Sequence, residues 1–299
     1  TFSDAQHVLD AALLEKVFSE LVAEVPPQSR PEPRLATHNW MAQDGSLWSA
    51  LPRMAWALYG SGRNGDSQGV RLHLSFNVVE DKPVRAELRR AKDCERAVWK
   101  EQWRAGDAYI GDRYFSKDYR LLTRLQFKGC VYLLRLRRDA VIQLEEELPL
   151  TQADRRAGVV CQAWARLGAV TRTRSIRVRV VWVEAQGHEL ILVTNLGPEE
   201  LPAELVSLLY RRRWQVELFF RWIKCIFGCR HFLAESERGV TIQIYLALIA
   251  ALLLQLYTGR RPSKRMLELI QFYLLGYATL EELTAGLQHY LQQLSKKRA

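Results

Sequence analysis

The residues best placed for chemistry lie in one short stretch, YRRRWQVELFFRWIK, from Tyr210 to Lys224. It contains no Gly or Pro and predicts one uninterrupted helix. At about 100° per residue, Tyr210, Arg213 and Lys224 fall within roughly 40° of Glu217 around the axis, so the four form one stripe. Aromatic and aliphatic residues cover the other sides, so we expect the helix to be largely buried. A buried carboxylate beside cations costs free energy unless it binds something, which favours a site over a simple i,i+4 ion pair of Arg213 and Glu217.

The spacing within this stripe resembles a known signature. Tyr, two residues, Arg, three residues, Glu, six residues and Lys is typical of bacterial cut-and-paste DDE transposases of the insertion-sequence-four group, and the chain matches all four positions. The sequence that follows, residues 225–245, also resembles this group. The resemblance implies that Glu217 is one acid of a metal-binding triad. It also implies that Tyr210, Arg213 and Lys224 grip phosphates of DNA at the transposon end.

Two further acids are needed, because phosphodiester cleavage by two metal ions requires several oxygen ligands. Asp44 lies in AQDGS, where an Asp-Gly pair read alone predicts a turn, and the family's Asp-Gly motif implies a metal ligand instead. Asp112 lies in YIGDRYF, at the C-terminal end of a short apolar strand, and it resembles the family's Asp-Arg motif. The residues before Asp44 are not a clean apolar strand, and Tyr114 stands where the family commonly has Gly. The alternatives to Asp112 are Asp107, in a predicted turn, and Asp118, at a predicted helix start.

The resemblance implies a DNA transposase of an insertion sequence that cuts the element's ends and joins them to target DNA. Asp44, Asp112 and Glu217 would bind two Mg²⁺ ions, with Mn²⁺ able to substitute. The expected partners are double-stranded DNA and a second copy of the chain in a homodimer on DNA, with no membrane. The expected location is the cytoplasm, in association with the nucleoid. The rival interpretation is a catalytically silent DNA-binding derivative acting as inhibitor or regulator, which the short sequence before Asp44 favours and the retention of three acids opposes.

The composition restricts the partner and the compartment. The 299 residues carry a formal net charge of +10, which suits a polyanion, although DNA, RNA and an anionic membrane surface fit equally. Five scattered cysteines without a CxxC pair indicate a reduced, intracellular protein, and a zinc site at Cys225, Cys229 and His231 lacks a fourth ligand. No signal-peptide pattern opens the chain, and its first residue, Thr1, indicates a trimmed start. The apolar run 242–257 is short for a membrane span and predicts a buried core helix.

The sequence around the two Asp residues predicts alternating strands and helices. Residues 70–78 alternate apolar and polar side chains, as in a strand with one buried face, and His73 belongs to the polar set. The elements expected here are strands at 35–43, 70–78 and 84–88, a helix at 94–104, a strand at 108–111, a helix at 118–125 and a strand at 130–136. Periodicity does not choose the sheet topology. The resemblance implies an α/β fold with a ribonuclease-H-like mixed sheet flanked by helices.

These patterns and the resemblance together divide the chain into four regions. They are an N-terminal helix and linker at 1–34, the first part of the catalytic core at 35–137, a β-rich insertion at 138–197, and the second part of the core with C-terminal helices at 198–299. Ser3 and Gln6 predict a capping box for the first helix. In the insertion, Arg177 and Arg179 would form the basic face of a hairpin, and Trp182 is predicted to be a core residue. The C-terminal helices are expected at 240–257, 266–275 and 280–294.

Overall fold

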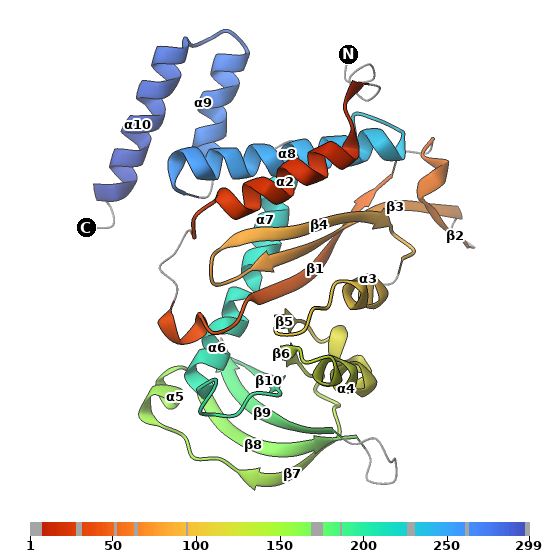
Figure 1. Cartoon of the computed structure of the whole chain (residues 1–299), viewed down its shortest axis with the longest axis vertical. Helices are drawn as coiled ribbons and strands as arrows, with labels where there is room; N and C mark the ends of the chain where they lie inside the picture. Colours follow the sequence, from red (N-terminus) through yellow and green to blue (C-terminus); the bar gives the residue numbers. More distant parts are fainter. Residues whose placement is uncertain are drawn as a thin grey trace. The chain divides into compact units, whose positions relative to one another are not determined.

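A mixed sheet of ten strands forms the core of residues 29–220 (Figure 1). In the computed structural model, the described residues are 8–27, 32–50, 53–62, 65–93, 95–168, 176–185, 187–225, 231–260 and 263–296. The strands are β1 Trp40–Ser49, β2 Leu58–Gly62, β3 Gly65–Asn77, β4 Lys82–Arg90, β5 Ala108–Gly111, β6 Val131–Arg135, β7 Ile142–Glu147, β8 Val159–Leu167, β9 Ile176–Ala185 and β10 His188–Thr194. Their order is β2-β3-β1-β5-β6-β10-β9-β8-β7, and β4 pairs with β3 off this path.

The strand directions in the first half of the sheet identify the fold. β3 is antiparallel to both β1 and β4, whereas β1, β5 and β6 run parallel to one another. Parallel strands need crossover connections, and α3 Glu95–Glu101 and α4 Tyr119–Phe127 lie in them. Three antiparallel strands followed by two parallel strands with helical crossovers make a ribonuclease-H-like core. The predicted fold class is therefore confirmed.

The first strand differs most from its prediction. A short 3₁₀ helix, Pro33–Leu35, occupies the start of the predicted strand, and β1 begins only at Trp40 and continues to Ser49. Asp44 and Gly45 therefore lie within the strand rather than in a turn, where they pair with Leu74 and His73 of β3. The strand tolerates this polar sequence because Asp44 is on the face that a later helix covers.

The insertion continues the core sheet. β10 pairs antiparallel with β6, and β9, β8 and β7 follow in order, so backbone hydrogen bonds join the insertion to the core. The predicted basic face is wrong for Arg179, which is fully buried. Its guanidinium donates to Gln162 Oε1 at 3.1 and 2.8 Å and to the carbonyl oxygen of Leu201 at 2.6 Å, which compensates its desolvation. Arg177 is exposed, and Trp182 packs, partly buried, against the core.

The helix predicted from Tyr210 to Lys224 is interrupted at Arg213. α6 Ala203–Arg212 and α7 Trp214–Cys225 flank this residue, which keeps helical dihedral angles, φ −51° and ψ −35°. The Arg213 N–H donates to the carbonyl oxygens of Leu209 and Tyr210, both at 3.2 Å, and its own carbonyl accepts from the Val216 N–H at 3.2 Å. Bonds to the third preceding residue tighten the turn, so the prediction of one uninterrupted helix was wrong although the backbone remains helical.

The ends of the chain, residues 1–28 and 221–299, form a second, helical unit. Its elements are α2 Ala11–Glu24, α8 Glu237–Thr258, α9 Lys264–Leu274 and α10 Leu280–Lys296. α2 begins at an Asp10 cap and packs on α8, where Phe18 meets the edge of Tyr245 with ring centroids 5.9 Å apart. α8 is long and apolar enough to cross a membrane, but 61% of its most apolar window is buried, as expected for a core helix. The predicted capping box at residues 3 and 6 and the Cys229 position lie outside the described residues.

Candidate active site

The strand register places the two aspartates side by side. In the parallel pair β1 and β5, Trp40 is opposite Ala108 and Ala42 is opposite Ile110. Extending this register by two residues sets Asp44 opposite Asp112, which follows directly after the end of β5. Neighbouring strands lie about 4.8 Å apart. Residues 210–224, much later in the chain, supply the rest of the site from α6 and α7.

α7 brings Glu217 to the same face of the sheet. Side chains alternate along β1, so Asp44 and Trp48 point to one side. Trp48 packs against Phe220 of α7 with ring centroids 6.4 Å apart, and Phe76 of β3 packs against Phe219 at 5.6 Å. These two aromatic contacts fix α7 across β1 and β3. Glu217, less than one turn earlier in the helix, is thereby held on the face that carries Asp44.

The three acids are electrostatic neighbours. The pKa of Asp44 is raised to about 7, chiefly by burial and to a smaller extent by the negative charges of Glu217 and Asp112. The Gly45 N–H, which donates to Asp44 Oδ1 at 2.8 Å, and the positive charge of Arg213 oppose these effects. The structure therefore brings Asp44, Asp112 and Glu217 into one cluster in which negative charge exceeds positive charge.

Arg213 is the cation at the centre of this cluster. Its Nη2 donates to Glu217 Oε1 at 2.6 Å, and its Nη1 lies 3.9 Å from Asp44 Oδ2. The guanidinium carbon is 5.8 Å from the centroid of the Tyr210 ring, and burial raises the pKa of that phenol. The Arg213 side chain is only 14% exposed. Lys224 lies in the last turn of α7.

The donor types suit a hard divalent cation, for which carboxylate oxygens are the preferred ligands. A buried aspartate whose pKa is raised by two neighbouring carboxylates lacks positive charge, which such a cation would supply. In the described part of the chain, no three His, Cys, Asp or Glu side chains gather closely enough to hold an ion. The ion pairs of Arg213 with Glu217 and Asp44 explain this arrangement, because the guanidinium takes the oxygens that an ion would need.

The two alternative aspartates have structural partners. Asp118 caps α4 by accepting from the Arg120 N–H at 3.0 Å. Asp107 accepts from the Tyr109 hydroxyl at 3.3 Å and lies 3.8 Å from Arg85. Asp112 also accepts a backbone hydrogen bond, from the Tyr114 N–H at 2.9 Å, but unlike the other two it stands opposite Asp44 in the strand register.

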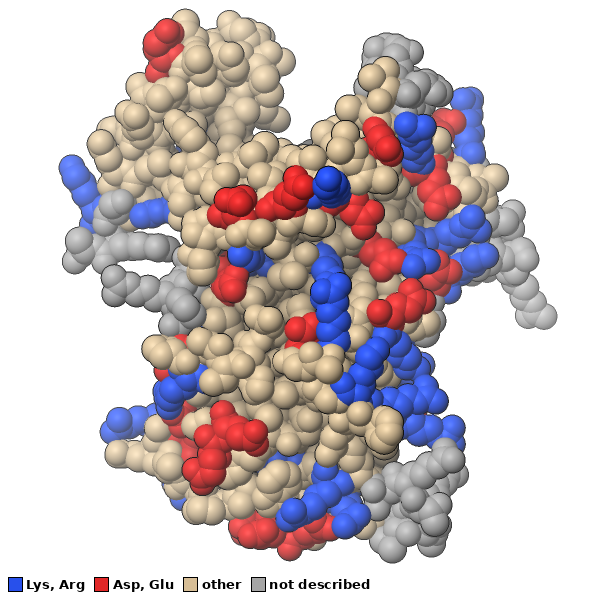
Figure 2. Space-filling view, viewed as in Figure 1, with Lys and Arg blue, Asp and Glu red and all other residues tan. Residues whose placement is uncertain are grey.

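A groove of about 1090 Å³ opens beside the acid cluster, and sequence reasoning missed most of its residues. Tyr210 and Arg213 line it together with the half-exposed Trp214. Its other basic side chains come from the ends of β5 and β6, from α5 Gln152–Arg156 and from α6: Arg113, Arg135, Arg137, Arg138, Arg156 and Arg211. In the sequence, only the several arginines at and after the ends of β5 and β6 could have indicated this groove. Elsewhere on this unit, Figure 2 shows Lys and Arg side chains gathered beside α3 and α4, with Asp and Glu among them.

Several known proteins are similar to this chain. The family model described as "Transposase DDE domain" matches residues 37–253. A probable transposase for insertion sequence element IS5377 of Geobacillus stearothermophilus is 22% identical over 246 residues, which cover 81% of this chain and 63% of that protein. A putative transposase, y4zB, of Sinorhizobium fredii is 25% identical over 259 residues, 85% of this chain and 70% of that protein. This chain thus spans about two thirds of these relatives. A solved piggyBac transposase synaptic complex with hairpin DNA matches with a TM-score of 0.40 and 8% identity, over 85% of this chain and 56% of that one.

Proposed function

Because the chain belongs to the transposase DDE domain family, we propose that it is the catalytic part of an insertion-sequence transposase that cuts DNA at the element's ends and joins them to target DNA. The observation that carries this proposal is the meeting of Asp44, Asp112 and Glu217 on one face of the sheet. The proposed location is the cytoplasm, on the nucleoid, and the proposed assembly is a homodimer on DNA.

In this proposal the three carboxylates hold two Mg²⁺ ions, for which Mn²⁺ substitutes. When bound, a pair of divalent ions activates a water or a 3′-hydroxyl for attack and stabilises the leaving oxygen. The protein's part is to fix the acids, with Asp44 and Asp112 on rigid parallel strands and Glu217 on a helix held by two aromatic contacts. Rigid elements position such ligands more closely than loops do.

Arg213 is proposed to exchange partners when DNA binds. Without DNA, its guanidinium compensates the charge of Glu217. A phosphate in the groove offers the same planar fork a bidentate partner, and Glu217 is then free to bind cations. Tyr210, whose ring lies beside this guanidinium, would orient it, and Lys224 would contact a phosphate as a point charge. The groove arginines would contact further phosphates of the DNA backbone. The salt dependence of DNA affinity would then grow with the number of phosphates they neutralise.

Glu217→Gln tests this function. The change keeps the size of the side chain and its bond to Arg213 but removes the charge that would bind a cation. We expect Mg²⁺-dependent cleavage of DNA carrying the element's ends to fall at least a thousandfold, while binding to the same DNA changes less than about threefold. Full cleavage by the variant would discard the assignment. Equal absence of cleavage in the unmodified protein, with end binding retained, would instead support the silent DNA-binding derivative, which the Arg213 ion pair across the acids also suits.

A further inference from the structure

A fourth acid, Glu95, lies against the strand that carries Asp44. Glu95 is the first residue of α3, and its side chain is 20% exposed. Its Oε1 is 2.5 Å from the point where a Cβ on Gly45 would stand, so a side chain at this position would have to displace the carboxylate. Gly45 has no left-handed backbone conformation that would otherwise require glycine. The glycine of the Asp-Gly pair in β1 thus lets the Glu95 carboxylate approach the strand closely.

Glu95 approaches the acid cluster from the opposite face of the sheet. Gly45 and Asp44 are consecutive, so their positions face opposite sides of β1, with α7 on the side of Asp44 and α3 on the side of Gly45. β5 ends at Gly111, so no strand continues beside β1 at this level. Asp112 follows that strand end, and its charge acts on Glu95 as well as on Asp44. Asp112 is thus the electrostatic neighbour of an acid on each face.

A small cavity lies between Glu95 and β1. This cavity of about 10 Å³, the size of one water molecule, is lined by Asp44, Gly45, Glu95, His73 and Trp99 among others. His73 is 6% exposed, contrary to the polar-face prediction, and its Nε2 has no hydrogen-bond partner. The Trp99 Nε1 is likewise buried without a partner. Unpartnered polar atoms in a cavity beside two carboxylates indicate a small polar ligand there.

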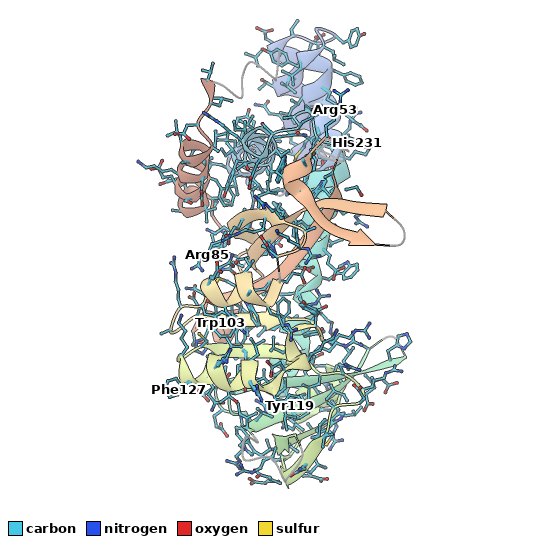
Figure 3. The ribbon with its side chains drawn as sticks, turned by 90° about the vertical axis from the view of Figure 1, so that its right-hand side faces the viewer. Arg53, Arg85, Trp103, Tyr119, Phe127 and His231 are labelled. Atoms are coloured by element: carbon cyan, nitrogen blue, oxygen red, sulfur yellow. The ribbon has the colours of Figure 1, made fainter. Side chains whose placement is uncertain are left out.

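α3 holds Glu95 in a fixed position. Arg85 of β4 donates from Nη1 to the carbonyl oxygen of Gln102 at 2.8 Å, just beyond the end of the helix (Figure 3). Gln102 in turn donates from Nε2 to Glu87 Oε2 at 3.0 Å. Trp99 packs between Trp103 and the Phe115 ring, with centroids 5.4 and 4.4 Å away. The carboxylate at the start of α3 is therefore placed by the sheet.

We propose that Glu95 is a fourth carboxylate of the cation site, acting with Asp44 and Asp112 from the α3 face of the sheet. This rests on the proposed function, since it assumes that Asp112 and Glu217 bind divalent cations. Two such ions carry four positive charges, and a fourth carboxylate balances them where three do not. Glu95 and Glu217 then stand on opposite sides of the two aspartates, each able to complete the oxygen ligands of one ion.

The competing explanation is a structural ion pair. Arg71 Nη1 lies 3.1 Å from Glu95 Oε1, and this contact alone could account for the acid. Arg71→Gln separates the two explanations, because it removes the pair and leaves the carboxylate. If Glu95 serves only Arg71, the variants Arg71→Gln and Glu95→Gln should have the same effect. If it binds cations, only Glu95→Gln should weaken their binding.

Mn²⁺ titration of the full chain, followed by electron paramagnetic resonance, gives a readout independent of cleavage. Glu101→Gln on the same helix, with a 62% exposed side chain, is the matched control. We expect Glu95→Gln to weaken Mn²⁺ binding at least tenfold, Glu95→Asp to restore part of it, and Arg71→Gln and Glu101→Gln to stay within twofold. Circular dichroism should show equal folding of all variants.

Each other outcome rejects a defined statement. Binding within twofold of the unmodified protein for Glu95→Gln, with loss in Asp112→Asn, overturns the role of Glu95 and leaves the proposed function standing. Equal losses in Glu95→Gln and Arg71→Gln assign Glu95 to the ion pair. Unchanged binding in both Asp112→Asn and Glu217→Gln rejects the cation site of the proposed function itself.

Discussion

Replacing Asp44 by Asn should stabilise the protein in the absence of cations and DNA. The pKa of Asp44 is raised from 3.8 to about 7, chiefly by burial. Because the folded pKa lies above the unfolded one, the folded state binds the proton more tightly, and stability falls as the pH rises between these two values. A shift of about 3 units corresponds to roughly 4 kcal/mol at pH 8. Water around the side chain, which is 30% exposed, reduces this to about 2 to 3 kcal/mol.

Asn removes that cost and keeps the short contact, since its amide oxygen can still accept from the Gly45 N–H. We expect guanidinium denaturation, followed by tryptophan fluorescence, to show a gain of about 2 to 3 kcal/mol at pH 8 and less than about half of it at pH 5. Asp139→Asn, at a side chain that is 66% exposed, is the control and should change little. Mg²⁺ should stabilise the unmodified protein at pH 8 and not the variant. A loss of stability at pH 8, or a gain that does not shrink at pH 5, would refute the reasoning.

Three further predictions follow from packing and charge. Phe219→Ala should lower the free energy of unfolding by about 3 to 5 kcal/mol, and cleavage should fall with it because α7 positions Glu217; calorimetry and the cleavage assay check both. Arg179→Met should cost roughly 3 kcal/mol in urea denaturation, since it leaves a buried carbonyl and amide without a donor, and a change below 1 kcal/mol would contradict this. Arg135→Gln with Arg137→Gln should lower the slope of log affinity for DNA against log salt by about 2, and an unchanged slope would place DNA outside the groove.

The sequence predicted local elements better than their interruptions. β5 was predicted at its observed bounds, because a short apolar segment between turns has few alternatives. The turn at Arg213 was missed, since nothing in a run of helix-forming residues distinguishes a bond to the third preceding carbonyl from one to the fourth. Arg179 was placed in solvent because alternation alone cannot show that Gln162 and the Leu201 carbonyl would receive its guanidinium.

In the candidate site, too, the sequence indicated individual residues but not the contacts that folding creates between them. Asp112 and Glu217 were selected by spacing and family resemblance, and in the folded chain the charges of both act on Asp44. Glu95 was not selected, because its position depends on where β5 ends and on the missing Cβ of a residue 50 positions earlier, which are properties of the folded sheet. The pairing of Arg213 with Glu217 was visible as an i,i+4 spacing, but its reach toward Asp44 was not.

Because β10 pairs with β6, the insertion and the strands next to the aspartates belong to one continuous sheet. β6 also pairs with β5, so two ladders of backbone hydrogen bonds connect β10 of the β9–β10 hairpin to β5, the strand that Asp112 follows. A load applied to that hairpin by bound nucleic acid would reach the aspartate through the sheet without passing through a flexible linker. Lengthening the insertion at its tip would therefore be tolerated more readily than a break in β10.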